Sequence, residues 1–163
     1  MVGVAVVVSA AAIYLASPKQ TEVSKNAEKQ FLEMMIPHEE RAIEVSQGTI
    51  NKSVSSETVE LARTISTDRR AMVDHMQLWY KDWYTSDILK FGKLADAGPT
   101  TVATEIDTEE EFFSLMIPHH EESIAMAKKV EADAFHQEIK DTVASILEKH
   151  STELKLMKQY KSQ

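Results

Sequence analysis

The sequence contains no cysteine, which excludes disulfide bonds, thiolate zinc sites and cysteine nucleophiles. Glycine and proline are scarce, with 4 of each in 163 residues, and this favours a helical protein with few turns. Basic residues are outnumbered, because 18 lysines and arginines face 26 aspartates and glutamates, for a net charge of −8. A surface that binds phosphates must be basic, so we expect no nucleic-acid partner. No nucleophile–base pair or phosphate-binding loop stands out, and we do not expect an enzyme.

One long apolar run lies at the start of the chain. Residues 2–17, VGVAVVVSAAAIYLAS, carry no charge but are shorter than the roughly 20 residues of a usual membrane span. No lysine or arginine precedes the run, and no good cleavage site follows it, which disfavours a signal peptide. We expect residues 1–18 to form an uncleaved membrane-anchor helix that contacts lipid through residues 2–17. A hydrophobic arm docked on the protein is the alternative.

The remainder, residues 19–163, has the length and pattern of one helical domain. Ser55 or Ser56 is suited to cap the second helix, and Thr108 with Glu111 forms a capping box for the third. Asp133 is the expected cap of the fourth helix. Residues 92–107 contain two glycines and a proline and form the expected linker. The predicted helices span about residues 17–47, 56–91, 108–130 and 133–160.

Two segments that lie 81 positions apart repeat one another. FLEMMIPHEERAIEVS (31–46) and FFSLMIPHHEESIAMA (112–127) both place a proline and a histidine inside a helix. The match extends further, because Ile65 and Met76 recur as Ile146 and Met157 at the same offset. Each repeat, residues 22–91 and 108–161, is therefore a helical hairpin that cannot bury its own apolar face. We predict that the two hairpins pack into an all-α, ferritin-like four-helix bundle.

Five of the six histidines fall on apolar stripes of the predicted helices, so that each helix contributes at least one. Three of them follow a methionine by three residues, which makes the two side chains neighbours on a helix. Thioether and imidazole groups together suit Cu(I), whereas the Glu-x-x-His motif of di-iron bundles is absent. The alternative is that these residues only fill the core, as methionine often does.

The second repeat holds the stronger candidate ligands for copper. Helix geometry places His119 and His150 about 8 Å apart in height and Met116 almost level with His150, so ligands of this hairpin can share one ion. In the first repeat, His38 and His75 are expected about 14 Å apart in height, too far to share one. The predicted copper ligands are Met116, His119, His120, Met126 and His150, and the weaker candidates are Met35, His38, Met72, His75 and Met76.

The motif MIPHHEESIAMA resembles the ferritin-like family named domain of unknown function 305, which includes the CopM-like copper-binding proteins. The family pattern is M-I-x-H-H followed by M-A, and then a second helix with an isoleucine, a methionine and a tryptophan or tyrosine. The first repeat departs from it at Glu39, where a second histidine is expected, and at Val45, where a later methionine is expected. The resemblance covers about residues 25–160 and implies a ferritin-like four-helix fold and, for some members, copper binding outside the cytoplasm. The matching positions are Met116, His119, His120, Met126, Ile146, Met157 and Tyr160, with Met35, His38, Met76 and Trp79 in the first repeat.

Two functions are compatible with these features. The first is a single-pass, membrane-anchored copper-binding protein whose bundle lies outside the cytoplasm or in a lumen. The second is a structural subunit of a larger assembly, such as a membrane complex or the membrane or shell of a virion, with a vestigial metal site. A site built on histidines should lose copper below about pH 6, because only neutral imidazole binds metal, whereas thioethers do not titrate.

Overall fold

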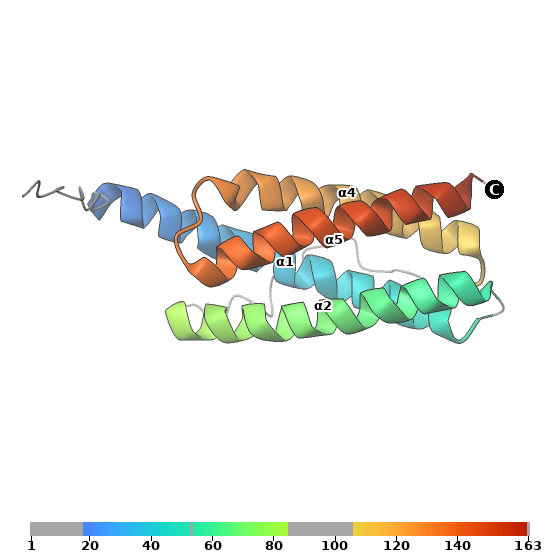
Figure 1. Ribbon diagram of the computed structural model, residues 1–163. Coiled ribbons are helices and arrows are strands. Elements are labelled where there is room, and N and C mark those ends of the chain that lie inside the picture. The colour runs from blue at the N-terminus through green and yellow to red at the C-terminus, as the bar shows by residue number, and fades with distance from the viewer. Residues whose placement is uncertain (1–17, 53, 85–105, 163) are drawn as a thin grey trace, which may run out of the picture.

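The computed structural model describes residues 18–52, 54–84 and 106–162, and its secondary structure there is helical. Figure 1 shows the helices side by side along one long axis. The predicted four-helix bundle is therefore confirmed. Its helices are α1 (Pro18–Ile50), α2 (Ser56–Trp83), α4 (Glu109–Glu131) and α5 (Gln137–Lys161).

The predicted anchor lies almost entirely outside the described residues, as does most of the 92–107 linker, so both stay predictions. None of the helices within the described part of the chain is both long and apolar enough to cross a membrane. Two helix ends differ from expectation. Helix α1 continues through Gly48 to Ile50, and α2 ends at Trp83 rather than near residue 91. Tyr84 leaves the helical conformation there, and its hydroxyl donates a hydrogen bond to the carbonyl of Lys25 on α1.

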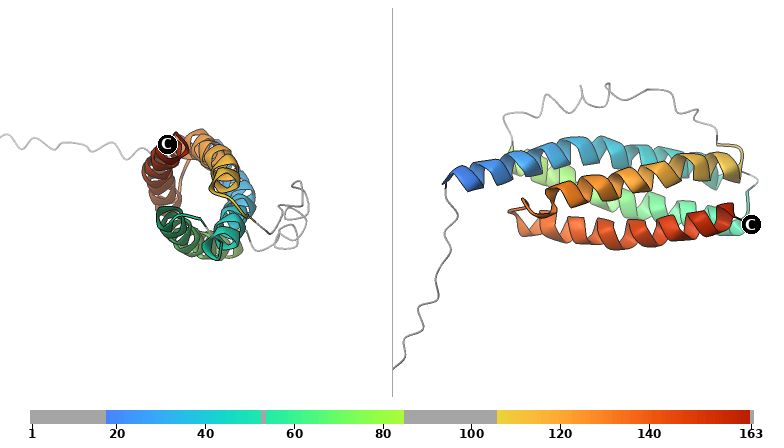
Figure 2. Two further views of the ribbon diagram at one scale, coloured as in Figure 1. Left: turned by 90° about the vertical axis from the view of Figure 1, so that its right-hand side faces the viewer. Right: turned by 90° about the horizontal axis from the view of Figure 1, so that it is seen from above.

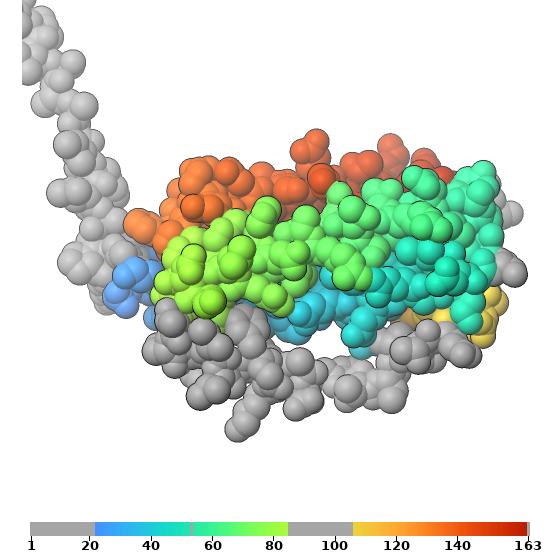
Figure 3. Space-filling view, turned by 90° about the horizontal axis from the view of Figure 1, so that it is seen from below, coloured from blue at the N-terminus to red at the C-terminus, as the bar shows by residue number. Residues whose placement is uncertain are grey.

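The helices pack in a ring around a central axis. Helix α1 packs against both α2 and α4, and α4 packs against α5. The end-on view in Figure 2 shows the resulting order α5, α4, α1, α2. The fourth side, between α2 and α5, holds a groove lined by residues of both helices and is bridged by an ion pair of Lys149 with Asp68 at 2.7 Å. On the face shown in Figure 3, α2 lies between α1 and α5.

The core consists of two apolar clusters separated by a polar layer. One cluster contains Phe31 and Ile146, and the other contains Phe112 and Met157. Each helix carries buried polar residues between the residues of the two clusters, such as Glu39 on α1, Arg69 on α2, His120 on α4 and His150 on α5. This layer therefore crosses the middle of the bundle, where each helix is firmly held on both sides by apolar packing. Its most buried members are Glu39, Arg69, His119, His120, Ser123, His150 and Glu153.

The two hairpins are related by an internal twofold symmetry. His38 and His119 are 81 residues apart, and their rings stack on one another with centroids 3.9 Å apart. Asp68 and Lys149 are also 81 residues apart and form the ion pair between α2 and α5. A residue can contact its own repeat equivalent only near a twofold axis. The axis therefore passes between α1 and α4, through the polar layer, and out between α2 and α5.

Each hairpin caps a helix of the other hairpin. On α1, Glu28 is fully buried and accepts hydrogen bonds from the backbone N–H groups of Phe135 and His136, at 2.5 and 2.6 Å. On α4, Glu109 accepts one from the backbone N–H of Ser55 at 2.7 Å. Glu28 and Glu109 occupy equivalent repeat positions, as do the N-cap residues His136 and Ser55. The twofold symmetry thus extends to the helix termini.

The structure corrects one of the expected helix caps and confirms two others. Asp133 does not cap α5. The N-cap is His136, whose side chain makes no capping hydrogen bond, because the carboxylate of Glu28 already occupies that helix end. The Ser55 cap and the Thr108–Glu111 capping box are present as predicted. A carboxylate also interacts favourably with the positive end of the helix dipole.

We predict that Glu28→Ala lowers the free energy of unfolding by about 1–3 kcal/mol, because it removes a buried carboxylate that accepts hydrogen bonds from two partly buried backbone N–H groups. The matched control is Glu109→Ala at the equivalent, more exposed cap, where water can replace the carboxylate and the loss should be about 0.5–1 kcal/mol. Urea unfolding of the full chain measures both. An equal or larger loss in the Glu109 variant would show that burial does not govern the strength of these caps.

Candidate metal centre

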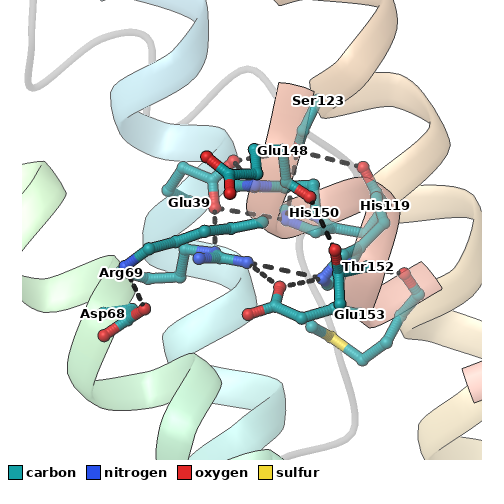
Figure 4. A network of polar contacts seen from close by, with 12 residues as sticks. Glu39, Asp68, Arg69, His119, Ser123, Glu148, His150, Thr152 and Glu153 are labelled. Atoms are coloured by element: carbon teal, nitrogen blue, oxygen red, sulfur yellow. Dashed lines mark hydrogen bonds and ion pairs between the residues drawn. The ribbon is translucent and has the colours of Figure 1, made fainter. Parts of the chain in front are cut away.

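The polar layer is built around Arg69, a fully buried arginine on α2. Its Nε lies 3.2 Å from Oε2 of Glu39 on α1. Its Nη2 donates to Oε2 of Glu153 on α5, and lies 3.4 Å from Nε2 of His120 on α4. Figure 4 shows this convergence of Glu39, Arg69 and Glu153 at the centre of the bundle. One guanidinium therefore joins all four helices.

Glu39 is the second centre of contacts. One of its oxygens, Oε1, accepts a hydrogen bond from the hydroxyl of Ser123 at 2.8 Å and lies 3.3 Å from Nε2 of His150. The other, Oε2, lies 3.5 Å from Nε2 of His119, in addition to its contact with Arg69. This carboxylate, which stands where the repeat pattern leads one to expect a histidine, is completely buried.

Three side chains at this point have the geometry of a metal site. His38, Glu39 and His119 each offer a ligand atom, and these atoms lie within 4.8 Å of one another. The stacking of His38 on His119 fixes both rings on either side of the twofold axis. His38 is the more exposed of the two, with 15% of its side chain accessible. An ion could therefore reach the group from the surface between α1 and α4.

His120 and His150 lie deeper, with ring centroids 5.0 Å apart. Nδ1 of His120 faces the carbonyl of Met116 at 2.9 Å, and its Nε2 faces Oε2 of Glu153 at 2.8 Å. Nδ1 of His150 has no hydrogen-bond partner among the described residues, although it is buried. A buried polar atom without a partner is costly, so this nitrogen is a candidate ligand atom.

The surroundings lower the pKa values of three histidines and of Glu39, which favours neutral imidazole rings and an ionised carboxylate. Burial lowers the pKa of His150, and of His120, and this outweighs the carboxylates beside them. Burial and the neighbouring His119 lower the pKa of His38. Burial opposes ionisation of Glu39, but its contacts with His119 and His150 hold the pKa of this carboxyl well below its ordinary value. At neutral pH the rings of His38, His120 and His150 are therefore neutral beside ionised carboxylates, and neutral imidazole is the form that binds metal.

The structure brings together part of the predicted ligand set. His119, His120 and His150 lie in one layer, and His119 and His120 are buried as predicted. The methionines belong to the apolar clusters: Met116 to one, and Met35 and Met76 to the other, against which Met72 and Met126 also pack. The participation of any thioether in a metal site stays a prediction.

One expectation about the first repeat is wrong. His75 does not point into the bundle but is exposed beside the groove between α2 and α5, where its ring stacks on Trp79. The inward stripe of α2 instead runs through Arg69, Val73 and Met76. A helical stripe covers a wide arc, and His75 lies at its edge, on the side that no neighbouring helix closes.

Sequence analysis missed the three charged residues of the layer, namely Glu39, Arg69 and Glu153. A signal existed for two of them. Glu39 is 81 residues before His120, and Arg69 is 81 residues before His150. A charged residue at the repeat equivalent of a buried histidine is expected to be buried too, and to need a partner of opposite charge. Glu153 gave no such signal, because its equivalent is Met72.

Comparison with protein families and solved structures finds related proteins along most of the chain. The family model described as Domain of unknown function (DUF305) matches twice, at residues 28–100 and 92–161. The structure of CopM in the Cu(II)-bound form is 26% identical, with a TM-score of 0.71, and the match covers 82% of this chain and 94% of that one. CopM in the Cu(I)-bound form is 29% identical, with a TM-score of 0.67 and the same coverage.

A further match is more distant. The crystal structure of a DUF305 fragment from Deinococcus radiodurans shares the fold at 20% identity, with a TM-score of 0.62, and the match covers 82% of this chain and 94% of that one. No curated protein matches the chain in sequence.

We predict that Arg69→Met lowers the free energy of unfolding by about 3–5 kcal/mol, because it leaves two buried carboxylates without their cation. The matched control is Arg70→Met, which removes the adjacent, exposed arginine of the same helix and should cost no more than about 0.5 kcal/mol. Urea unfolding in the presence of a metal chelator compares the two. Similar losses in both variants would refute the central place given to Arg69.

Proposed function

This chain belongs to the DUF305 family, and from that membership and the buried imidazole–carboxylate centre we propose that it binds one copper ion. The observation that carries the proposal is the group of His38, Glu39 and His119, whose ligand atoms lie within 4.8 Å of one another. The similarity to CopM, solved in Cu(I)-bound and Cu(II)-bound forms, supports copper rather than another metal.

The residues present fit a copper ion chemically. Imidazole nitrogens are suitable ligands for copper, and a carboxylate supplies negative charge. Glu39 and Glu153 are both held in their ionised form, and Arg69 is the permanent cation that contacts them. Two carboxylates and one guanidinium leave one negative charge uncompensated in a buried place. A bound cation would compensate it, and burial of unpaired charge is otherwise costly.

We propose that His38, Glu39 and His119 hold the ion, with Nε2 of His150 next to the same carboxylate at 3.3 Å. Bound copper would supply a soft positive charge at the twofold axis. The other residues position these ligands. Ser123 donates to Glu39, and the carbonyl of His119 lies 3.1 Å from Nε2 of His38, so the two hairpins hold each other's ligand groups.

This assignment shifts the expected donors from sulfur toward nitrogen and oxygen. The described contacts of the central histidines are with carboxylates, with each other and with backbone carbonyls. Such a set is harder than one of thioethers and suits Cu(II) as well as Cu(I). The role that we propose is storage or transfer of copper. The membrane anchor and a location outside the cytoplasm stay proposals.

We predict that the full chain binds one copper ion and that His119→Ala with His120→Ala abolishes this binding. The first substitution removes a ligand, and the second removes the ring that packs against it at 5.5 Å. The chain is freed of metal, loaded with Cu(II), or with Cu(I) under ascorbate, and passed through a desalting column before elemental analysis. His75→Ala is the matched control, because it removes a histidine outside the layer.

The control variant should retain copper at the level of the parent. Circular dichroism establishes that the double variant is folded before its copper content is interpreted. Copper retained by a folded double variant would contradict the proposal, and the structural-subunit alternative would then account better for the bundle.

We also predict that copper affinity stays nearly constant from pH 7.5 to the ordinary imidazole value of about 6.5 and falls only below it. The reason is that burial lowers the pKa of His38 and His150, so protons displace metal from them at lower pH than from exposed histidine. Competition with a copper chelator at each pH measures the affinity, with circular dichroism to monitor folding. A decline centred above pH 6.5 would contradict the assignment of buried ligands, and constant affinity into strong acid would indicate thioether ligands instead.

A further inference from the structure

The internal symmetry makes four central positions equivalent in pairs. Glu39 and His120 form one pair of equivalents, and Arg69 and His150 form the other. The contacts across the bundle follow the same relation: Glu39 lies 3.3 Å from His150, and His120 lies 3.4 Å from Arg69. The second repeat therefore places two imidazoles where the first repeat places an anion and a cation.

The side chains around the guanidinium of Arg69 are of the types that bind metal ions. The guanidinium contacts a carboxylate oxygen from α1, another from α5 and a ring nitrogen from α4. The ring nitrogen is Nε2 of His120. This Nε2 also lies 2.8 Å from Oε2 of Glu153, the oxygen to which Arg69 donates. The carboxylate oxygen and the ring nitrogen therefore both lie next to Nη2 of Arg69.

We infer that Arg69 occupies the second cation position of the centre and thereby limits the chain to one copper ion. The side chains that contact the guanidinium, namely Glu39, His120 and Glu153, offer two carboxylates and an imidazole, and the arginine keeps a second cation from them. This inference rests on the proposed function for the first ion, and it adds the residue that sets how many ions bind.

The choice of arginine has a physical consequence. A guanidinium stays charged at any pH at which the protein is folded and, unlike copper, cannot be removed by a chelator. The carboxylates around it are therefore compensated whether or not copper is present. One half of the centre maintains the fold of the metal-free chain, and the other half, around His38 and His119, remains available to an exchangeable ion.

The test counts copper ions in variants of the full chain loaded with Cu(II) and freed of excess metal. Arg69→Met removes the cation and keeps the length of the side chain, so we expect copper per chain to rise from one to two. Arg69→Lys keeps a positive charge, and Arg70→Met removes the exposed neighbouring arginine. Both controls should stay at one. If Arg69→Met does not fold without metal, Arg69→His, which introduces the residue found at the equivalent position of the other repeat, should also bind two.

The outcomes separate this inference from the proposed function. One ion in the parent and still one in a folded Arg69→Met or Arg69→His variant would overturn the inference and leave the proposed function in place. No ion in the parent but one in either variant would overturn the proposed function, while showing that Arg69 blocks a cation position. Absence of copper from all of them would overturn both.

Discussion

The buried pair of Glu39 and Arg69 is the interaction on which the centre of this bundle depends. A carboxylate and a guanidinium in the middle of an apolar core are each strongly unfavourable unless they are paired and hydrogen-bonded. Here the pair is completed by Glu153, Ser123 and two histidines, which come from the two helices of the second hairpin. Because every helix contributes to this network, the relative positions of the four helices are fixed at the layer where the histidines lie.

The twofold symmetry explains how such a network fits a repeated sequence. At a symmetry axis, equivalent residues meet each other, and two identical charges would repel. The chain avoids this by placing opposite charges at one equivalent pair, Asp68 and Lys149, and stacked imidazole rings at another, His38 and His119. The exchange of helix caps through Glu28 and Glu109 follows the same symmetry farther from the axis, where repulsion does not arise. Because the two hairpins belong to one chain, the equivalent residues that meet at the axis can differ in type, whereas those of two identical subunits cannot.

The resemblance to copper-binding relatives and the polar layer point to the same place in the fold, but they emphasise different chemistry. The sequence motif is rich in methionine and histidine, which favours soft Cu(I). The structure assigns the methionines to the apolar clusters on both sides of the layer and surrounds the histidines with carboxylates. A cation bound in this centre would therefore be held by charge as well as by ligand type, and the permanent charge of Arg69 would be part of the site.

The sequence by itself determined the architecture, because helical periodicity, two capping signals and an 81-residue repeat are local or regular features that need no knowledge of packing. It also identified His119, His120 and His150 as buried, since they fall on apolar stripes. It could not determine which side chains meet. His75 lies on the same kind of stripe yet is exposed, because the side between α2 and α5 is open. Glu39, Arg69 and Glu153 look like ordinary charged residues of a helix surface until helices distant in sequence bring them together. Only the tertiary structure decided that these charges neutralise one another in the core, because the free energy of a buried charge depends on partners that lie 84 residues away in the chain, as Arg69 and Glu153 do.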